Sequence, residues 1–250
     1  MNVLILGGTT EASALCRMLQ DDARFRPTLS LAGITRTPVL PAVAVRRGGF
    51  GGVAGLAAFL RAEGVSALVD ATHPFARRMH GNAAEAAAAA GVPRLCVLRP
   101  AWSAAPGDRW TEGADMAEAA AALGPAPRRV LLTVGQNELA PFRGAPHHDY
   151  LLRSVEPPDP ATLPPRCRCF AARGPFTEDG ERTLFRQERI QVLVSKNSGG
   201  TAVAAKLAAA RALGIAVVLV RRPPPPPPPL VPDATAALGW LHHQAALRGV

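Results

Sequence analysis

Short apolar runs alternate with helix-like segments along most of this chain, and this alternation limits the possible folds more than any other feature. Val3–Leu6 is followed by a helix-like segment at Ala12–Leu19, and the same order returns at Ala67–Val69 and Ala76–Ala90. Parallel strands need long crossover connections, which helices supply, so single helices between strands predict a mostly parallel sheet. We therefore expect an α/β protein.

One segment, Arg99–Trp110, interrupts the alternation with two prolines and a glycine. We interpret residues 99–110 as the connection between two Rossmann-like domains, one of residues 1–100 and one of residues 111–250, with a cleft between them. Each domain would be a doubly wound, mostly parallel sheet. Further strands of the first domain are expected at Thr28–Ile34, Val39–Val45 and Val92–Leu98, and a helix at Val53–Arg61. Strands of the second are expected at Arg129–Val134, Tyr150–Ser154, Cys167–Ala171, Ile190–Ser195 and Ala216–Val220, with helices at Ala114–Leu123, Glu178–Arg189, Thr201–Leu213 and Ala234–Leu247.

A run of seven prolines, Pro223–Pro229, precedes the last expected helix. Prolines cannot donate to a strand ladder and favour an extended polyproline conformation. We interpret the run as a stiff spacer, with an SH3-type ligand as the alternative.

The charge balance of +9, with 28 basic residues against 19 acidic ones, favours an anionic ligand. Nucleic acid is disfavoured because no helix carries a basic cluster and the chain has one tyrosine for stacking on bases.

No apolar run approaches the roughly 20 residues of a membrane span, and the residues after Met1 enter a strand-like run directly. We expect a cytoplasmic protein. The four cysteines are too scattered for a disulfide framework or a metal site.

The first turn between strand and helix, Gly7-Gly8-Thr9-Thr10, has the features of a phosphate site. A helix N-terminus offers unpaired N–H groups and a partial positive charge, and glycines let the backbone approach a pyrophosphate. The third glycine of the GxGxxG pattern is absent, and Ala12 stands near its place. A dinucleotide-binding turn is the preferred interpretation, and a purely structural turn is the alternative.

The second strand indicates which dinucleotide would bind. No acidic residue lies between Asp22 and Glu63, although NAD-binding folds usually place one about 20 residues after the glycine turn to hold the ribose 2′-OH. Thr35 and Arg36 occupy the end of this strand instead. An arginine beside hydroxyls suits a 2′-phosphate, so NADP is favoured over NAD. Arg46 and Arg47 could assist, but we interpret them as solvated surface residues.

Two further loops follow expected strands of the first domain. The loop Gly49, Phe50, Gly51 and Gly52, preceded by Gly48, is either pressed against a ligand or mobile without a role, and the two readings are equally supported. Thr72 and His73 follow the fourth strand, at the sheet edge where α/β proteins bind ligands. His73 could donate a hydrogen bond or a proton, or could cap the following helix together with Thr72.

The second domain repeats the arrangement after the strand that ends at Ser195. Lys196, Ser198, Gly199, Gly200 and Thr201 combine a cation, hydroxyls and backbone N–H groups, which should bind a phosphate or a carboxylate. The lysine precedes the glycines, so this is not a Walker loop. Arg173 and Gly174 end a neighbouring strand and are expected to face the same site.

These motifs together resemble the precorrin-6A reductase family of cobalamin biosynthesis. The resemblance rests on GGTTEA at 7–12, GGFGG at 48–52, DATHPFA at 70–76, RPAW at 99–102, RGPF at 173–176 and SKNSGG at 195–200, and covers roughly residues 1–222. It implies NADPH-dependent reduction of one double bond of the macrocycle precorrin-6A to give precorrin-6B. The first domain would bind NADPH and the second the polycarboxylated tetrapyrrole, and other enzymes of the pathway are candidate partners.

The resemblance also implies a division of roles. The turn at residues 7–10 would hold the pyrophosphate, Arg36 the 2′-phosphate, and residues 49–52 with Thr72 and His73 would border the nicotinamide. Lys196 and its loop, with Arg173, would bind macrocycle carboxylates. His73 is the candidate proton donor, with a bound water as the alternative. Two rivals stay open, an S-adenosylmethionine-dependent precorrin methyltransferase and a tetrapyrrole- or nucleotide-binding protein without catalytic activity.

Overall fold

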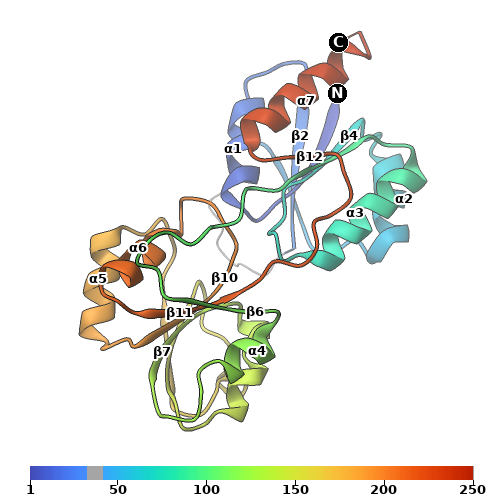
Figure 1. Ribbon diagram of the computed structural model, residues 1–250. Helices are drawn as coiled ribbons and strands as arrows, with labels where there is room; N and C mark the ends of the chain where they lie inside the picture. The colour runs from blue at the N-terminus through green and yellow to red at the C-terminus, as the bar shows by residue number, and fades with distance from the viewer. Residues whose placement is uncertain (33–41, 250) are drawn as a thin grey trace. The chain divides into compact units, whose positions relative to one another are not determined.

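Two compact units, built from different lengths of chain, make up the computed structural model, which describes residues 1–32 and 42–249 (Figure 1). The first unit contains Met1–Pro100 and Pro223–Val250, and the second contains Ala101–Arg222. The chain therefore leaves the first unit once and returns to it near its C-terminal end. No described helix is both long enough and apolar enough to cross a membrane.

The sheet of the first unit has six parallel strands in the order β12-β5-β4-β1-β2-β3. From β1 the chain builds outward through β2 and β3, then crosses to β4 and β5 on the other side of β1. The topological switch point lies between β1 and β4, and ligands of open α/β sheets bind at the carboxyl ends of the strands beside such a point. The strands are β1 (Asn2–Leu6), β2 (Arg26–Leu31), β3 (Ala44–Arg47), β4 (Ala67–Asp70), β5 (Arg94–Val97) and β12 (Leu230–Val231).

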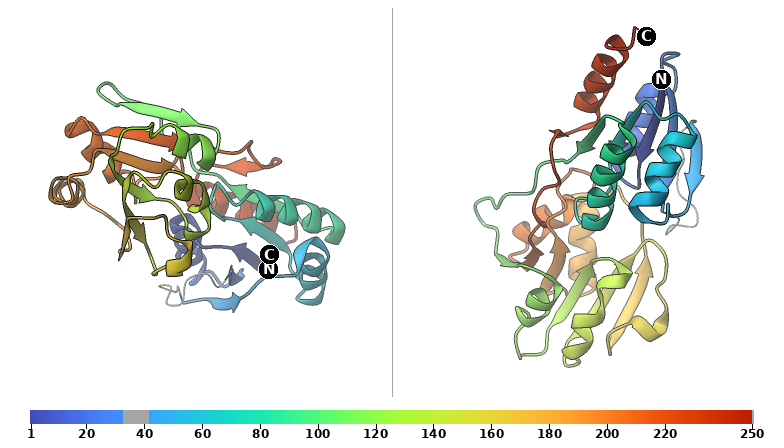
Figure 2. Two further views of the ribbon diagram at one scale, coloured as in Figure 1. Left: turned by 90° about the horizontal axis from the view of Figure 1, so that it is seen from below. Right: turned by 90° about the vertical axis from the view of Figure 1, so that its right-hand side faces the viewer.

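Helices cover both faces of this sheet. Helices α1 (Thr10–Leu19) and α7 (Ala234–Ala246) pack together, as do α2 (Gly52–Ala62) and α3 (Arg77–Ala90) (Figures 1 and 2). The residues of β1 divide with period two: Val3 and Ile5 join the core under α1 and α7, whereas Leu4 and Leu6 join the core under α2 and α3. Both faces of the strand are buried, which explains why its sequence is apolar throughout.

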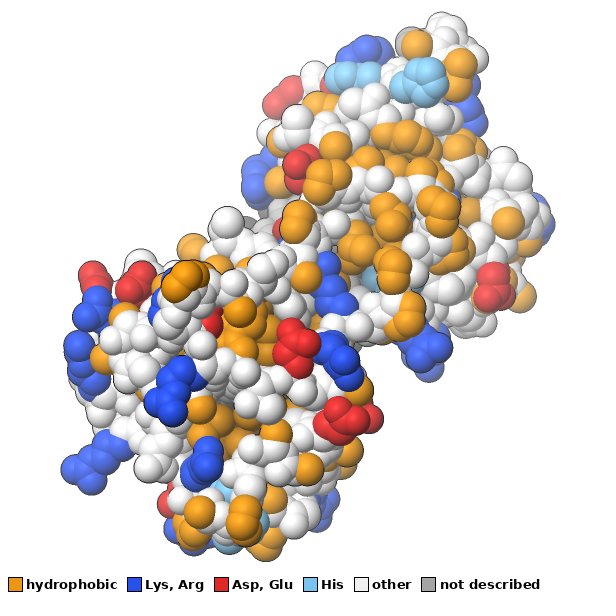
Figure 3. Space-filling model, viewed as in Figure 1, with side chains coloured by type: hydrophobic (Ala, Val, Ile, Leu, Met, Phe, Trp, Pro, Cys, Tyr) orange, Lys and Arg blue, Asp and Glu red, His pale blue; other side chains and the backbone are white. Residues whose placement is uncertain are grey.

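The C-terminal segment belongs to the first unit, so our expectation that residues 223–250 lie in the second domain is wrong. The short strand β12 pairs with β5, where Cys96 N donates to Pro229 O at 3.1 Å and Leu98 N donates to Val231 O at 2.8 Å. The Arg94 guanidinium donates to the carbonyls of Pro227 and Pro228 at 2.6 and 3.1 Å. The proline run cannot donate to a ladder, but its carbonyls accept hydrogen bonds at the sheet edge. In Figure 3, hydrophobic side chains gather on the visible face of the first unit.

Apolar burial explains why α7 returns to this unit. The helix contributes Ala237, Leu241 and Ala245, all fully buried, to the core that it shares with α1. Without it, the face of β4 and β5 on this side of the sheet would lose its apolar cover.

The second unit also has six parallel strands, in the order β6-β11-β10-β7-β8-β9. Its switch point lies between β7 and β10. Helices α5 and α6 pack together on one side of this sheet, and α4 lies on the other (Figure 1). The strands are β6 (Trp110–Gly113), β7 (Arg129–Thr133), β8 (Asp149–Ser154), β9 (Cys167–Ala171), β10 (Val192–Lys196) and β11 (Ala216–Val220). The helices are α4 (Met116–Ala121), α5 (Glu178–Gln187) and α6 (Ala205–Ala212), with short 3₁₀ turns η1 (Gln136–Glu138), η2 (Ala140–Gly144) and η3 (Pro160–Thr162).

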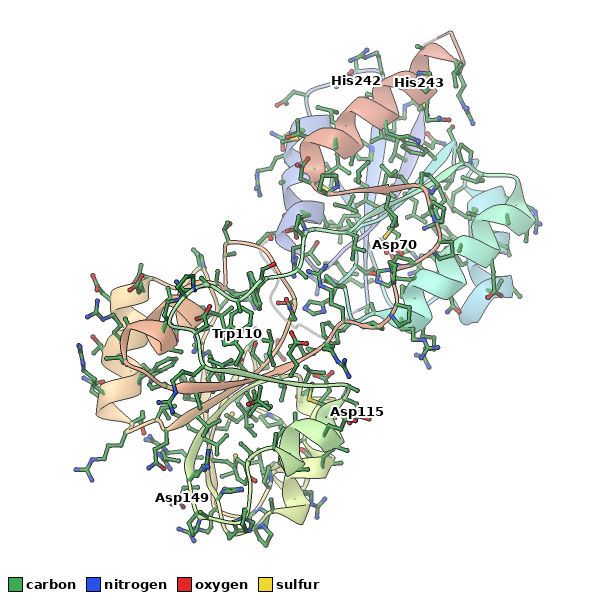
Figure 4. The ribbon with its side chains drawn as sticks, viewed as in Figure 1. Asp70, Trp110, Asp115, Asp149, His242 and His243 are labelled. Carbon is green, nitrogen blue, oxygen red and sulfur yellow. The ribbon has the colours of Figure 1, made fainter. Side chains whose placement is uncertain are left out.

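Among the boundaries in this unit that differ from expectation are those at Trp110, Ala114 and Thr201. Trp110, assigned above to the connection, begins the edge strand β6. The helix expected from Ala114 begins at Met116, because the Asp115 carboxylate (labelled in Figure 4) accepts hydrogen bonds from Ala117 N and Glu118 N at 2.8 and 2.9 Å. Helix α6 begins at Ala205, four residues after the expected start at Thr201.

Candidate cofactor and substrate sites

The turn after β1 is built as a helix N-terminus beside the switch point. Gly7 N donates to Ser30 O at 2.9 Å, and a Cβ on Gly7 would lie 2.4 Å from Leu29 Cδ1, so a larger residue would require the Leu29 side chain to move. Gly8 is exposed and has a φ of +109°, a conformation that favours glycine. Thr9 is the N-cap of α1: its Oγ1 accepts from Ala12 N at 3.2 Å and donates to Ala71 O at 2.7 Å. The predicted turn at residues 7–10 is therefore placed at the carboxyl edge of the sheet.

The hydroxyls of this turn are used within the protein. The Thr9 hydroxyl caps α1, and the Thr10 hydroxyl donates to Glu11 Oε2 at 3.1 Å. Glu11 in turn forms an ion pair with Arg99, 2.6 Å from Nη1 to Oε2. An anion at this turn would consequently be bound by backbone N–H groups rather than by the two threonine side chains.

Arg46 anchors the glycine-rich loop after β3, which corrects our interpretation of Arg46 as a solvated surface residue. Its guanidinium donates to Gly48 O at 2.5 Å and to Gly49 O at 2.7 Å, and stacks 3.8 Å from the centroid of the Phe50 ring. Gly51 and Gly52 have φ values of +79° and +89°, and Gly51 is the N-cap of α2. The loop is tied to its own strand, and Gly51 and Gly52 adopt backbone conformations that favour glycine.

A pocket of about 450 Å³, open space at its mouth included, lies between these segments. Its walls come from the ends of β1 and β2, the glycine-rich loop, the residues after β4, and one face of α3. The pocket thus brings together Gly7, Gly49, Phe50, Gly52 and Thr72 of the predicted site. The remaining lining residues are Leu6, Ser30, Ala32, Gly48, Met79 and Asn82.

Two residues predicted to hold the 2′-phosphate, Thr35 and Arg36, lie outside the described residues. They follow Ser30 and Ala32 in the sequence, and both of these line the pocket. The role predicted for Thr35 and Arg36 therefore stays a prediction.

A buried carboxylate, which the sequence analysis did not single out, supports Thr72. Asp70 is the last residue of β4, is fully buried, and lies within the first unit in Figure 4. Its Oδ1 accepts from Thr72 Oγ1 at 2.7 Å and from Thr72 N at 3.2 Å. Its Oδ2 lies 2.7 Å from Nδ1 of His80, a buried residue of α3. Asp70 and His80 thus fix the segment that carries Thr72 into the pocket. The only signal in the sequence was the position of Asp70 at a strand end.

Asp70, His80 and Cys96 form a buried cluster whose potential ligand atoms lie within 4.8 Å of one another. Burial raises the pKa of the Cys96 thiol to about 12. The 2.7 Å separation of the Asp70 and His80 atoms is that of a hydrogen bond. We interpret the cluster as structural support.

His73, the candidate proton donor, has a local role in the structure. Its Nδ1 accepts a hydrogen bond from Phe75 N at 3.2 Å, which stabilises the turn before α3. His73 is not among the residues that line the pocket. The N-cap of α3 is Ala76 and no side chain caps it, so His73 does not act as the helix cap, and its role as proton donor stays a prediction.

In the second unit, the loop after β10 is closed by Trp102. Asn197 Nδ2 donates to Trp102 O at 2.9 Å, Asn197 Oδ1 accepts from Trp102 N at 2.8 Å, and the indole Nε1 donates to Gly200 O at 2.9 Å. Arg222 donates to the carbonyls of Asn197 and Ser198, at 2.8 Å each. Trp102, the last residue of the motif at 99–102, is therefore hydrogen-bonded to the motif at 195–200.

The structure places the predicted substrate residues unevenly around this loop. Gly199 and Gly200 have φ values of +64° and +81°. A Cβ on Gly174 would lie 3.5 Å from Ala202 O, so the segment at 173–176 does pack against the loop. Arg173 and Thr201 are exposed, and Thr201 lies four residues before the start of α6 rather than at its first turn. Lys196 Nζ forms an ion pair with Glu138 Oε2 at 2.8 Å, a partner that the sequence analysis missed.

A second lysine, Lys206, was also missed. It lies in the first turn of α6, is 7% exposed, and donates from Nζ to Thr133 Oγ1 at 3.0 Å. Burial, together with the neighbouring Arg153 and Lys196, lowers the pKa of its ammonium group to about 7, although the Glu181 carboxylate acts in the opposite direction. Lys206 is one of two lysines among 28 basic residues, and this rarity was the available signal.

Comparisons with known proteins agree with the motifs. A model of the family described as precorrin-6x reductase CbiJ/CobK matches residues 2–242. A precorrin-6A reductase of Rhodobacter capsulatus is 48% identical over 249 residues, 99% of each chain. One from a Sinorhizobium species is 47% identical over 244 residues, 98% of this chain and 94% of that protein. The solved structure of CobK precorrin-6A reductase gives a TM-score of 0.93 at 47% identity, covering 98% of this chain and 97% of its own. The chain belongs to the precorrin-6x reductase CbiJ/CobK family, an oxidoreductase family of cobalamin biosynthesis, as its motifs predict.

Proposed function

We propose that this protein catalyses the NADPH-dependent reduction of one C=C bond of precorrin-6A, giving precorrin-6B. The observation that carries the proposal is the pocket at the switch point of the first sheet, lined by the glycine turn, the GGFGG loop and Thr72. Such a pocket suits one nucleoside half of a dinucleotide, with the pyrophosphate on the N-terminus of α1. Relatives that are 47–48% identical over nearly the whole chain are named precorrin-6A reductase. These names support precorrin-6A as the substrate, in its metal-free form.

The residues of the first unit would bind and orient the cofactor. Backbone N–H groups of the turn at residues 7–10 would hold the pyrophosphate, and Arg36 with Thr35 the 2′-phosphate. When bound, the reduced nicotinamide supplies a hydride to one carbon of the double bond, and a proton is added to the neighbouring carbon. Gly49–Gly52 and Thr72 would border the cofactor, and their fixed geometry favours positioning as the main source of rate.

The residues of the second unit would bind the macrocycle. The loop Ser198-Gly199-Gly200, with Lys196 and the neighbouring Arg173, would face the acetate and propionate groups. Lys196 already forms an ion pair with Glu138. Glu138 would hold the Lys196 ammonium group in place, and the backbone N–H groups of the loop would still be available to bind a substrate carboxylate.

The proposal is tested by following NADPH absorbance at 340 nm with the purified protein, precorrin-6A and each nicotinamide. We expect oxidation with NADPH in preference to NADH, and Arg36→Ala should raise KM for NADPH and reduce that preference. An unchanged NADPH/NADH ratio in Arg36→Ala would remove Arg36 from its role. Binding of both ligands without oxidation would contradict the proposed reaction.

Two glycines offer a matched test of the turn. Gly8 and Gly124 both have positive φ, and a Cβ at either would meet no atom within 4 Å. Alanine at either position should therefore carry similar backbone strain of about 1–3 kcal/mol. Gly8→Ala should weaken NADPH binding, whereas Gly124→Ala, in the second unit, should not. Equal NADPH affinity in the two variants would argue against a pyrophosphate at the turn.

A further inference from the structure

Lys206 lies at the switch point of the second sheet. Its Nζ is 3.0 Å from the hydroxyl of Thr133, the last residue of β7, and Thr133 lies opposite Ser195 of β10. The neighbouring residue of β10, Lys196, ends that strand. The ammonium group therefore lies at the carboxyl ends of the two central strands, where open parallel sheets bind their ligands.

The charged groups around Lys206 include Arg153, Lys196 and Glu181, and the Glu181 carboxylate raises the pKa of Lys206 whereas the two cations lower it. Arg153 of β8 forms a buried ion pair with Glu181 of α5, and Lys196 of β10 forms a partly exposed ion pair with Glu138 of η1. Within residues 1–32 and 42–249, no carboxylate oxygen lies within 4 Å of Lys206 Nζ. The cluster thus contains three cations and two carboxylates, and Lys206 is the cation that is left over.

The hydrogen bonds of Lys206 are also incomplete. An ammonium group has three protons to donate, and the Thr133 hydroxyl is the acceptor that the described part of the chain provides. That hydroxyl gives its own proton to Val194 O at 3.0 Å. A buried cation in this state is unfavourable unless an anion joins it, which agrees with its lowered pKa of about 7.

An aromatic ring lies beside the ammonium group on the side of the loop. Nζ is 5.7 Å from the centroid of the Trp102 ring, and the indole is held by its hydrogen bond to Gly200 O. Lys206 is therefore adjacent to the loop at 196–200 that the proposed function assigns to the macrocycle.

We propose that Lys206 Nζ binds one carboxylate of the substrate and so completes a third ion pair in this cluster. The inference rests on the proposed function for the identity of the ligand, a macrocycle bearing acetate and propionate groups. Lys206 would thereby fix the orientation of the macrocycle in the second unit.

The proposal predicts a pH dependence whose sign follows from the charge. The ammonium form binds a carboxylate and the neutral amine does not. The free protein carries the ammonium form below about pH 7 and loses it above, and the bound carboxylate raises the pKa again. The Kd for precorrin-6A should therefore be constant below about pH 7 and rise above it, by about tenfold per pH unit at most. Protons should be taken up on binding at pH 8.

The test compares Lys206→Met with Arg186→Met, which removes one positive charge from an exposed position on α5. The full-length protein is titrated with precorrin-6A without nicotinamide, following absorbance between pH 6 and pH 9. We expect Kd at pH 6.5 to rise at least tenfold in Lys206→Met, with a flat pH profile, and to stay within twofold in Arg186→Met. The Kd for NADPH should not change in either variant.

Three results would overturn the inference. The first is an unchanged Kd for precorrin-6A in Lys206→Met, and the second is a Kd for the wild-type protein that does not rise between pH 7 and pH 9. The third is a fall in kcat of Lys206→Met with no change in its Kd for precorrin-6A, which would make Lys206 a proton donor instead. The wild-type pH profile tests the proposal even if Lys206→Met does not fold. Failure of the proposed function is distinguishable, because binding that depends on Lys206 without NADPH oxidation would leave this inference standing.

Discussion

Gly55 of α2 allows a sharp test of how the glycine-rich loop forms the pocket. A Cβ at Gly55 would lie 1.7 Å from Phe50 O and 2.8 Å from Phe50 C, whereas real Cβ atoms essentially never approach within 3.0 Å. Gly55→Ala therefore requires the loop or the helix to move by more than 1 Å. Neither can move freely, because Arg46 stacks on Phe50, and Leu56 and Leu60 of α2 are fully buried.

The expected magnitude follows from two opposing effects. Overpacking costs about 1–3 kcal/mol, and contact with a backbone atom puts this site at the upper end. Alanine in a helix interior regains about 1 kcal/mol relative to glycine. The net loss of about 2 kcal/mol should lower the melting temperature by about 4–8 °C for a chain of this size. Since Phe50 lines the pocket, the affinity for NADPH should also fall, by about tenfold if about 1.4 kcal/mol of the strain is relieved there.

The matched control is Gly81→Ala, in helix α3 of the same unit, where a Cβ would meet no atom within 4 Å. This variant should be stabilised by about 0.5–1 kcal/mol and should bind NADPH normally. The measurements are thermal unfolding by circular dichroism and NADPH titration by fluorescence. If Gly55→Ala matched Gly81→Ala in both, the loop would not be held as the structure shows it.

Two other substitutions test groups that support the sites. Arg153→Met should destabilise the protein by about 3–5 kcal/mol, because it leaves the Glu181 carboxylate buried and unpaired. Adding Glu181→Leu should recover most of that loss. Chemical denaturation measures the stability of both variants, and a double variant as unstable as the single one would contradict the argument. His80→Leu should raise KM for NADPH, because Asp70 loses the donor that holds it against Thr72. His80→Asn should restore part of the affinity, because its side-chain amide can donate from near the position of Nδ1. Equal KM values in the two variants would show that the hydrogen bond does not position Thr72.

Much of the first site could be predicted because its signals are local. The glycine turn after β1, the GGFGG loop and the residues after β4 each stand next to an apolar run, and a parallel sheet places all strand ends of one kind at one edge. Thr9 as an N-cap follows from the same local reasoning. The role of Arg46 could not be predicted from local sequence, because its hydrogen-bond acceptors, Gly48 O and Gly49 O, depend on how the loop folds back over the strand.

The amino-acid sequence alone determined the class of fold, the two sheets and the family, because apolar periodicity and short motifs are properties of neighbouring residues. Tertiary structure decided where the C-terminal segment packs, since β12 has two residues and its partner β5 lies more than 130 positions earlier in the chain. It also decided that Lys206 and Asp70 are buried, Lys206 with no carboxylate within 4 Å among the described residues and Asp70 hydrogen-bonded to His80. Burial and pairing depend on which distant side chains surround a group, and no local pattern contains that information.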